Sequence, residues 1–305
     1  MSDSHADIML QLNQLLSEGR NPDTLDIDTG SSLDIVTAIN QEDHKVAPAV
    51  ADQLPQLAQA VELTTAQLQQ GGRLIYIGAG TSGRLGILDA VECRPTFSVP
   101  DDLVVGVIAG GKTAIEHAVE GAEDNEAQGV ADLKALNLGK TDVLVGLSAS
   151  GRTPYVAAAL DYANEQGCVT IAVACSPNSR ILCQARVAIC PQVGPEALTG
   201  STRMKSGTAQ KMVLNILSTA VMIKLGKTYS NLMVDVHASN NKLRARAVRI
   251  VMQATDCDEP TAQQSLKTAH GNTKVAILML LARCDFAQAE QLLAQHQGVL
   301  RSSLS

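Results

Sequence analysis

Two short loops hold the residues of this sequence that are best suited to bind a phosphate group. The first loop, Gly78-Ala-Gly-Thr-Ser-Gly83, follows the apolar run Leu74–Ile77 and carries the hydroxyls of Thr81 and Ser82. A glycine-rich turn that opens a helix after a strand binds phosphate, because backbone N–H groups and the positive end of the helix converge there. A tight turn without a ligand is the alternative, and the spacing alone leaves both open.

The second loop, Ser148-Ala-Ser-Gly-Arg-Thr153, has the same character. It follows the apolar run Val143–Leu147 and adds the hydroxyls of Ser148, Ser150 and Thr153. The next residue is a proline, which suits the first turn of a helix. Each serine alone is equally consistent with an ordinary helix N-cap. Five hydroxyls in two matched loops favour one phosphomonoester dianion over a bridging pyrophosphate.

A dinucleotide site is what the G-x-G-x-x-G spacing first suggests, and the rest of the unit argues against it. Such a fold closes its second strand with an acidic residue that binds a ribose hydroxyl. Here the second apolar run ends in Gly110-Gly111-Lys112, whereas Asp101 and Asp102 precede that run, at its wrong end. We therefore expect a phosphate ligand other than a dinucleotide.

Both loops require a parallel sheet whose strands end at one edge. Five short β-branched runs alternate with helical segments: RLIYIG, LVVGVIAG, DVLVGLS, CVTIAVAC and RVAICP. Runs that are apolar on both faces and separated by helices are typical of a parallel sheet covered on both sides. The sequence therefore predicts an α/β fold with a doubly wound, five-stranded parallel sheet between two helical layers. Both loops then lie at the carboxyl ends of strands, where such sheets bind ligands.

Helical patterns flank the predicted sheet. Before it, apolar residues recur at helical spacing from Val46 to Leu68, and Gly71-Gly72 ends that helix. After it, the sequence predicts one helix and then a small bundle of three short helices, over His237–Ala254, Thr261–Leu266, Lys274–Arg283 and Phe286–Gln295. The expected divisions are an N-terminal helical segment over residues 1–45, a sheet domain over 46–250 and a C-terminal helical bundle over 251–305.

Composition argues against several classes of partner. The 24 basic and 31 acidic residues give a net charge of −7, and the chain has no Trp and two Phe, so we do not expect nucleic acid to bind. No apolar run of about 18 residues offers a membrane span, and the start of the chain lacks the basic region of a secretory signal. Seven cysteines without C-x-x-C and six histidines without metal-ligand spacing indicate a cytoplasmic protein with reduced thiols and no metal site.

The two loops resemble those of the sugar isomerase, or SIS, domain, whose members bind phosphosugars in this way. The resemblance becomes specific at residues 194–211, GPEALTGSTRMKSGTAQK, which look like the signature shared by N-acetylmuramic acid 6-phosphate etherases and the glucokinase regulatory protein. The regulatory protein holds two such domains, so a chain with one resembles the bacterial etherases. Further matching segments are residues 78–89, 118–124, 150–155 and 231–235.

This resemblance implies a set of substrate-binding residues in the two loops and in the signature. Four basic residues near the loops are candidates for phosphate binding: Arg84, Arg152, Arg203 and Lys205. Each is equally consistent with a pairing to a surface carboxylate, and the signature supports Lys205 most. The implied set is Gly80, Thr81, Ser82, Gly83, Ser148, Ser150, Gly151, Thr153, Ser201, Arg203 and Lys205.

The resemblance also implies a reaction, the cleavage of the 3-O-lactyl ether of N-acetylmuramic acid 6-phosphate to N-acetylglucosamine 6-phosphate and D-lactate. An alkyl ether is a poor target for direct hydrolysis, but in the ring-opened sugar the C3 oxygen lies β to the aldehyde. Removal of the C2 proton then lets lactate leave, and water adds at C3. This route requires an acid/base pair and oxyanion stabilisation, with no metal and no redox cofactor.

Two glutamates resemble the family's acid/base residues. By this resemblance, Glu92 transfers protons in the elimination, including protonation of the departing lactate, and Glu123 activates the incoming water. A helix that begins at Ser82 and ends before Pro95 puts Glu92 about 15 Å from Ser82 along its axis. That is more than a hexose phosphate comfortably spans. Either Gly86 interrupts the helix, or the carboxylate serves another subunit, and we favour a homodimer with shared active sites.

Two other functions suit the same fold. One is a non-catalytic phosphosugar-binding regulator that uses the C-terminal helices as its partner surface. The other is an aldose–ketose isomerase of sugar phosphates, which would release no lactate. An assay for D-lactate separates the etherase from both.

Overall fold

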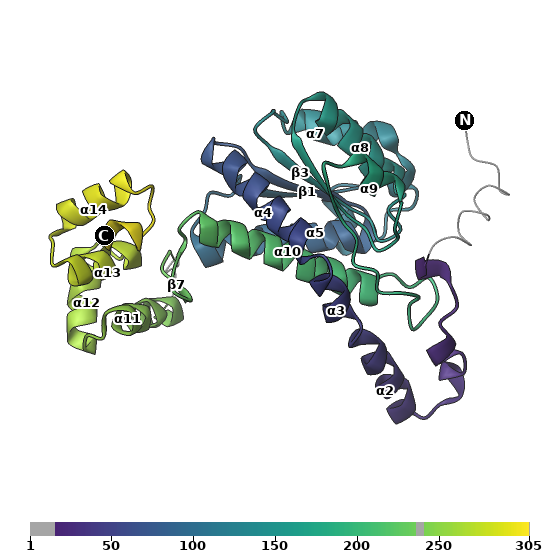
Figure 1. Cartoon of the computed structure of the whole chain (residues 1–305), viewed down its shortest axis with the longest axis horizontal. Coiled ribbons are helices and arrows are strands. Elements are labelled where there is room, and N and C mark those ends of the chain that lie inside the picture. Colours follow the sequence, from purple (N-terminus) through teal and green to yellow (C-terminus); the bar gives the residue numbers. More distant parts are fainter. Residues whose placement is uncertain (1–15, 236–240, 305) are drawn as a thin grey trace. The chain divides into compact units, whose positions relative to one another are not determined.

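The computed structural model describes residues 16–235 and 241–304, which form two compact units (Figure 1). The larger unit runs up to Ala90 and again from Asp102 to Leu217, and the smaller one holds Val91–Asp101 and the chain from Ser218 on. The bounds of these units do not coincide with the expected divisions after residues 45 and 250. Residues 16–45 lie in the larger unit, together with the sheet.

The predicted five-stranded parallel sheet is confirmed. Its strands follow one another in space in the order β2-β1-β3-β4-β5, and all neighbouring pairs are parallel. Strands β1, β3 and β4 are buried along their whole length, as expected for runs that are apolar on both faces. The bounds are β1 Leu74–Gly78, β2 Val104–Ile108, β3 Val143–Leu147, β4 Val169–Val173 and β5 Val187–Ile189.

The strand order creates a switch point between β1 and β3. From β1 the chain crosses to β2 on one side, whereas from β3 it crosses to β4 on the other side. Doubly wound sheets of this order bind ligands in the crevice outside the carboxyl ends of the strands at such a point. Gly78 at the end of β1 pairs with Leu147 at the end of β3, so both predicted loops leave the sheet at the same level.

Helices cover both faces of the sheet (Figure 1). On one face Ile75 and Ile77 of β1 pack with Leu133 of α7 and Leu160 of α8 in one apolar core. On the other face α5 lies so close to β1 that a Cβ on Gly86 would come within 2.9 Å of the Tyr76 side chain. The helices around the sheet are α4 Leu54–Gln69, α5 Gly80–Phe97, α6 Thr113–Glu116, α7 Glu126–Ala135, α8 Pro154–Glu165, α9 Arg180–Gln184 and α10 Lys205–Lys224.

The single helix predicted from Val46 to Leu68 is wrong in one respect, because the structure breaks it in two. Helix α3 covers Val46–Ala51 and α4 begins at Leu54. Pro55 stands in the first turn of α4, where its missing N–H costs nothing, but it cannot continue a preceding helix. The apolar spacing runs through the break because each helix buries its own apolar residues, Val46 and Val50 in α3 and Leu57 and Val61 in α4.

The segment before α3 is held by side-chain caps and turns. Helix α2 covers Ser32–Asp43, and its N-terminus has a capping box in which Ser31 and Asp34 bond each other's backbone N–H groups. Three 3₁₀ turns precede it, over Leu16–Glu18, Pro22–Thr24 and Ile27–Thr29. Residues 16–45 are called the N-terminal arm below.

The smaller unit confirms the three short C-terminal helices. Their starts are capped by the side chains of Asp258, Asn272 and Asp285, and Gly271 takes the left-handed conformation that separates the first helix from the second. The helix expected from His237 begins at Asn241 among the described residues, since residues 236–240 lie outside them. The bounds are α11 Asn241–Thr255, α12 Glu259–Thr268, α13 Thr273–Ala282 and α14 Phe286–Gln295, with a short hairpin of β6 Thr228–Tyr229 and β7 Leu232–Met233 before them.

A buried lysine ties the smaller unit together. Lys274 Nζ donates to the carbonyls of Gly226 and Gly298, at 3.0 Å each, and to Asp235 Oδ2 at 2.7 Å. Burial lowers the pKa of Lys274, although the carboxylate of Asp235 works in the opposite direction. The ammonium therefore fastens the segment after α10 to the C-terminal helices.

Candidate active site

The first loop is built from two glycines that no other residue can replace easily. Gly80 opens α5 with φ at +52°, in the left-handed region that glycine tolerates best. At Gly83 a Cβ would stand 2.6 Å from the Ile108 side chain and 2.7 Å from the carbonyl oxygen of Gly78. The loop is thus pressed against the ends of β1 and β2, with the N-terminus of an 18-residue helix directly behind it.

The second loop gathers its three hydroxyls into one cluster. Ser148 Oγ lies 2.8 Å from Thr153 Oγ1 and 3.4 Å from Ser150 Oγ. The backbone N–H of Gly151 donates to Ser148 Oγ at 3.0 Å, and Gly151 itself has φ at +70°. The sequence predicted these residues together, and the structure places them together at the end of β3.

The start of α10 lies beside the first loop. A Cβ on Gly207 would be 3.5 Å from Thr81 Cγ2, and Ser82 Oγ donates to Gln210 Oε1 at 2.8 Å. Of the signature residues just before this helix, Ser201 is half-buried and Arg203 is exposed. Two segments that are distant in sequence, the first loop and the start of α10, therefore lie side by side.

Lys205 does not present its charge to the loops. Its side chain is 1% exposed, and Nζ lies 2.5 Å from Glu42 Oε2 in the N-terminal arm. The backbone N–H groups of Lys205 and Ser206 donate to the carboxylate of Glu196 at 2.9 Å each. The signature at residues 194–211 predicts Lys205 as a substrate-binding residue, whereas the structure places its charge in a buried ion pair.

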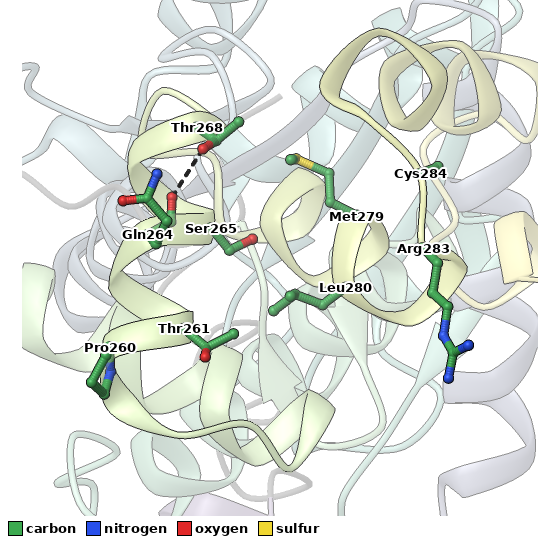
Figure 2. Close-up of a pocket in the computed structure, with 9 residues that line it drawn as sticks. All are labelled: Pro260, Thr261, Gln264, Ser265, Thr268, Met279, Leu280, Arg283 and Cys284. Atoms are coloured by element: carbon green, nitrogen blue, oxygen red, sulfur yellow. Dashed lines mark hydrogen bonds between the residues drawn. The ribbon is translucent and has the colours of Figure 1, made fainter.

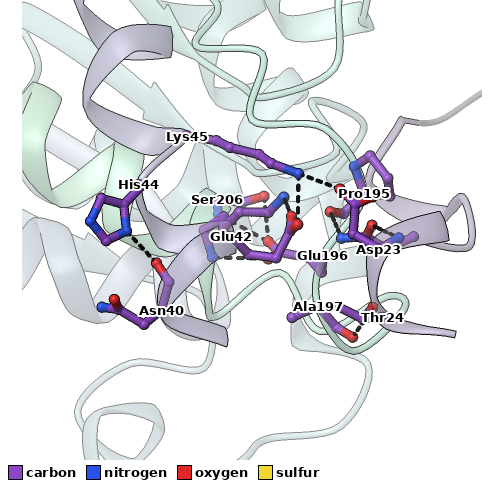
Figure 3. A network of polar contacts seen from close by, with 12 residues as sticks. Asp23, Thr24, Asn40, Glu42, His44, Lys45, Pro195, Glu196, Ala197 and Ser206 are labelled. Carbon is purple, nitrogen blue, oxygen red and sulfur yellow. Dashed lines mark hydrogen bonds and ion pairs between the residues drawn. The ribbon is translucent and has the colours of Figure 1, made fainter. Parts of the chain in front are cut away.

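Figure 3 shows the polar network that surrounds this ion pair. Lys45 Nζ donates to a second oxygen of Glu42 at 2.6 Å and to Asp23 at 2.8 Å. Burial works to raise the pKa of Glu42, but hydrogen bonds from Lys205 and Lys45 outweigh it and lower that pKa to about 2. Glu42 is therefore ionised at neutral pH. Sequence reasoning missed it, because nothing local marks a residue whose partner is 163 positions away.

The N-terminal arm also holds the backbone of residues 194–204, the part of the signature that precedes α10 and is called the signature loop below. Asn21 Nδ2 donates to the carbonyl of Pro195 at 3.3 Å. Thr24 Oγ1 donates to the carbonyl of Ala197 at 2.9 Å (Figure 3). Together with the Glu42–Lys205 pair, these bonds fix both ends of the stretch that carries Ser201 and Arg203.

Glu92 lies on an unbroken helix. α5 runs from Gly80 through Gly86 and past Pro95 to Phe97, so the expected end before Pro95 is wrong and an interruption at Gly86 is excluded. Gly86 serves instead as the place where the helix touches the sheet. The side chain of Glu92 is exposed, ten residues beyond Ser82, which corresponds to a rise of about 15 Å.

A buried carboxylate one turn before Glu92 fixes the rotation of α5. Tyr76 Oη donates to Asp89 Oδ2 at 2.9 Å, and Asn215 Nδ2 donates to Asp89 Oδ1 at 2.6 Å. These bonds link α5 to β1 and α10. Sequence reasoning missed this residue, although a charged side chain between apolar helix positions is a signal that could have found it.

Glu123 lies in the 3₁₀ turn Ala122–Asp124 that precedes α7, and its side chain is exposed. The segment that leads to it is tied to the first loop by Arg84, whose guanidinium donates to the carbonyls of Ile115 at 3.0 Å and His117 at 3.2 Å. The sequence makes Arg84 a candidate for phosphate binding, but in the structure its guanidinium donates to these backbone carbonyls. The start of α5 and the approach to Glu123 are therefore held together.

The smaller unit contains a hollow of its own, of about 600 Å³, shown in Figure 2. Met279 and Leu280 of α13 contribute apolar surface, and Thr261 and Gln264 of α12 contribute polar groups. None of its nine lining residues is acidic, so this hollow supplies no carboxylate pair for an elimination. In the described residues of the chain, no helix combines the length and apolarity that a membrane crossing demands.

Comparison with known proteins gives matches along nearly the whole chain. The chain matches the N-terminal SIS domain of glucokinase regulatory protein over residues 56–164, the SIS domain over 118–220 and the C-terminal lid domain of glucokinase regulatory protein over 230–275. It is 62% identical to the N-acetylmuramic acid 6-phosphate etherase of Pseudoalteromonas atlantica, over 99% of this chain and 98% of that protein. It is 60% identical to N-acetylmuramic acid 6-phosphate etherase 2 of Vibrio cholerae, over 97% of each.

Solved structures share the fold at much lower identity. A phosphoheptose isomerase from Francisella tularensis has a TM-score of 0.50 at 18% identity and covers 64% of this chain. A phosphosugar isomerase involved in capsule formation, from Bacteroides fragilis, has a TM-score of 0.50 at 20% identity and covers 67% of this chain and 98% of that one. These likenesses establish the doubly wound sheet and leave the chemistry to the residues of the site.

Proposed function

The chain belongs to the N-acetylmuramic acid 6-phosphate etherase family, and we propose that its two hydroxyl-bearing loops hold the phosphate of the substrate while Glu92 and Glu123 perform the acid/base chemistry. The protein is a carbon–oxygen lyase of cell-wall amino sugar recycling. It cleaves the D-lactyl ether of N-acetylmuramic acid 6-phosphate to N-acetylglucosamine 6-phosphate and D-lactate. Identity over nearly the full length of the etherases favours this activity over the isomerase and the non-catalytic regulator.

The observation that supports the proposed site is that both loops leave the sheet at the paired ends of β1 and β3, at the switch point. Hydroxyls of Ser148, Ser150 and Thr153 cluster at the end of β3, and Thr81 and Ser82 begin the helix after β1. Two helix N-termini and these hydroxyls offer donors, whereas a phosphate dianion offers only acceptors. Gly80, Gly83 and Gly151 let the backbone come close, and we propose that Ser201 and Arg203 add further donors to the phosphosugar. Lys205 contributes through its ion pair with Glu42.

The reaction proceeds in two halves. Glu92 removes the C2 proton from the ring-opened sugar, the electrons of the C2–H bond form a C2–C3 double bond as the C3–O bond breaks, and Glu92 passes the proton to the oxygen of the departing lactate. Water then attacks C3 of the unsaturated aldehyde and gives a proton to Glu123, and C2 takes up a proton from solvent. No electrons are gained or lost overall, so acid/base groups are sufficient.

The test of this route is incubation of the protein with N-acetylmuramic acid 6-phosphate in water enriched in both deuterium and heavy oxygen. We expect deuterium at C2 and heavy oxygen at C3 of the product, because both atoms come from solvent in the second half. A product labelled at neither position would exclude elimination followed by water addition. D-Lactate release in the same samples shows that turnover occurred.

The enzyme acts as a homodimer with shared active sites in this proposal. On α5, Leu88, Val91 and Glu92 are spaced i, i+3 and i+4 and therefore share one helix face. Leu88 is 51% exposed and Val91 is 64% exposed, an unusual setting for large apolar side chains beside a carboxylate. A second copy that covers this stripe would bring the Glu92 of one subunit to the loops of the other.

Mixing two inactive variants tests the shared site. Glu92→Gln chains lack the acid, and Ser148→Ala/Ser150→Ala chains lack loop hydroxyls. When they are unfolded together and refolded as mixed dimers, we expect lactate release to recover to about a quarter of the wild-type rate, since half of the dimers are mixed and one of their two sites is intact. Each variant refolded alone is the control. Activity no higher than that of the separate variants would contradict sharing.

The cytoplasm is the compartment we propose. Cys168, Cys175 and Cys190 are free thiols in the described residues, and burial raises the pKa of each. Buried free thiols fit a reducing environment.

A further inference from the structure

The hydroxyl of Ser82, in the first loop, is paired with a buried glutamine. Ser82 Oγ donates to Gln210 Oε1 at 2.8 Å, and the two residues are 8% and 1% exposed. Gln210 stands on α10, one turn after Ser206, whose backbone and hydroxyl are bound by Glu196. The glutamine therefore projects toward the loop from a helix start that is firmly held.

The other end of this amide is unsatisfied. Gln210 Nε2 is fully buried and has no hydrogen-bond partner in the described structure. A buried N–H without an acceptor is unfavourable and rare. The oxygen and nitrogen of a side-chain amide occupy nearly equivalent positions, so a half-turn of the amide brings Nε2 to Ser82 Oγ. That rotation gives the buried donor an acceptor.

The rotation also decides where the Ser82 proton goes. A serine hydroxyl has one proton, and while it is donated to Gln210 Oε1 none is left for a ligand. A phosphate dianion can only accept, so it can use Ser82 only when that proton points toward it. With Nε2 as donor to Ser82 Oγ, the hydroxyl proton is released.

We propose that Gln210 is a positioning residue of the phosphate site: its amide turns when the phosphosugar binds, Nε2 donates to Ser82 Oγ, and the Ser82 proton passes to a phosphate oxygen. This rests on the proposed function, in which the first loop binds the phosphate. Each of the two hydrogen bonds, Gln210 to Ser82 and Ser82 to phosphate, then has one donor and one acceptor. The bond from Ser82 to the phosphate is strong because its acceptor is charged.

Two substitutions at Gln210 separate donation from packing. Gln210→Glu keeps the shape and, as the carboxylate, can only accept, so it retains the Ser82 proton. Gln210→Met removes the bond and leaves the hydroxyl free to turn. We expect KM for N-acetylmuramic acid 6-phosphate to rise about 10-fold or more in Gln210→Glu and about 3-fold in Gln210→Met, with kcat within about 3-fold of wild type in both. Thr208→Glu, at an exposed position of the same helix, controls for the added charge and should leave KM within about 2-fold.

A double-mutant cycle shows whether Gln210 acts through Ser82. Ser82→Ala alone should raise KM about 10-fold, and in that background Gln210→Glu should add no more than Thr208→Glu adds. The role of Gln210 would be overturned if Gln210→Glu raised KM equally with and without the Ser82 hydroxyl, or if KM in Gln210→Glu were no higher than in Gln210→Met. Neither result would affect the phosphate assignment of the first loop. If Ser82→Ala leaves KM unchanged, the phosphate assignment of the first loop fails and the inference falls with it. Thermal midpoints of all variants identify any that fail to fold. If Gln210→Glu fails to fold, Gln210→Met replaces it in the double-mutant cycle.

Discussion

Replacing Glu92 with Gln is expected to lower kcat for D-lactate release by about 10²–10⁴-fold while KM changes by less than about 3-fold. A positioned acid/base group contributes a factor of this size to proton transfer. The amide keeps the shape of the side chain but cannot deliver a proton to the departing lactate. Because the proposed phosphate donors lie in the two loops, binding of the phosphosugar should survive. Steady-state assay of D-lactate over a range of substrate concentrations measures both constants.

Two other Glu→Gln substitutions serve as comparisons, one as a control and one that tests the second half of the reaction. Glu116 is an exposed glutamate on α6, and Glu116→Gln should leave kcat within about 2-fold of wild type. Glu123→Gln should instead block the second half of the reaction, so that about one equivalent of lactate per site appears rapidly and the unsaturated aldehyde accumulates. A Glu92→Gln enzyme that turns over at the wild-type rate would remove this residue from the chemistry.

The sequence was sufficient for the parts of the fold that depend on local pattern. The runs that became β1 to β5 are rich in β-branched residues and apolar on both faces, which leaves no alternative to buried strands. The breaks near Gly271 and Asp285 were visible because a left-handed glycine and a capping carboxylate act within a few residues. The break before Pro55 was missed because periodicity continues through it.

The candidate site also has features that local sequence predicts and features that depend on residues far apart in the chain. The two loops were predicted because glycine and hydroxyl residues follow strands directly, and their convergence follows from a parallel sheet. Pairings across the chain were not visible: Glu42 with Lys205, Asp89 with Tyr76 and Asn215, and Ser82 with Gln210. A charged residue in a signature suggests contact with substrate when its buried partner is unknown. Lys205 was therefore predicted to bind phosphate, although it pairs with Glu42.

The buried pair of Glu42 and Lys205 should dominate the stability of the larger unit. The two side chains are nearly inaccessible, and their charged atoms are 2.5 Å apart. Removing one member of such a pair leaves the other charge in a medium that solvates it poorly, which costs about 3–5 kcal/mol. The two members are not equivalent, however, because Glu42 has a second cation in Lys45, whose side chain is about half exposed.

We therefore expect Glu42→Leu to lower the free energy of unfolding by about 3–5 kcal/mol and Lys205→Met by less, about 1–3 kcal/mol, since Lys45 still neutralises Glu42. The double variant should recover to within about 1 kcal/mol of wild type, because no unpaired charge remains at the pair and apolar side chains fill the space. Denaturant unfolding of the three variants measures these differences. A double variant as unstable as Glu42→Leu would show that packing around the arm, rather than charge pairing, is the main contribution.

The pH dependence of the same variants gives a second measure of the pair. The pKa of Glu42 is lowered in the folded chain, from an ordinary value of 4.5 to about 2. A carboxylate shifted in this direction stabilises the fold above its unfolded pKa and loses that contribution as the pH falls through the folded value. The gap in stability between wild type and Glu42→Leu should therefore be constant at neutral pH and narrow between about pH 4.5 and about pH 2. A gap that keeps its full size across this range would mean that the carboxylate of Glu42 is not what holds the arm to the signature loop.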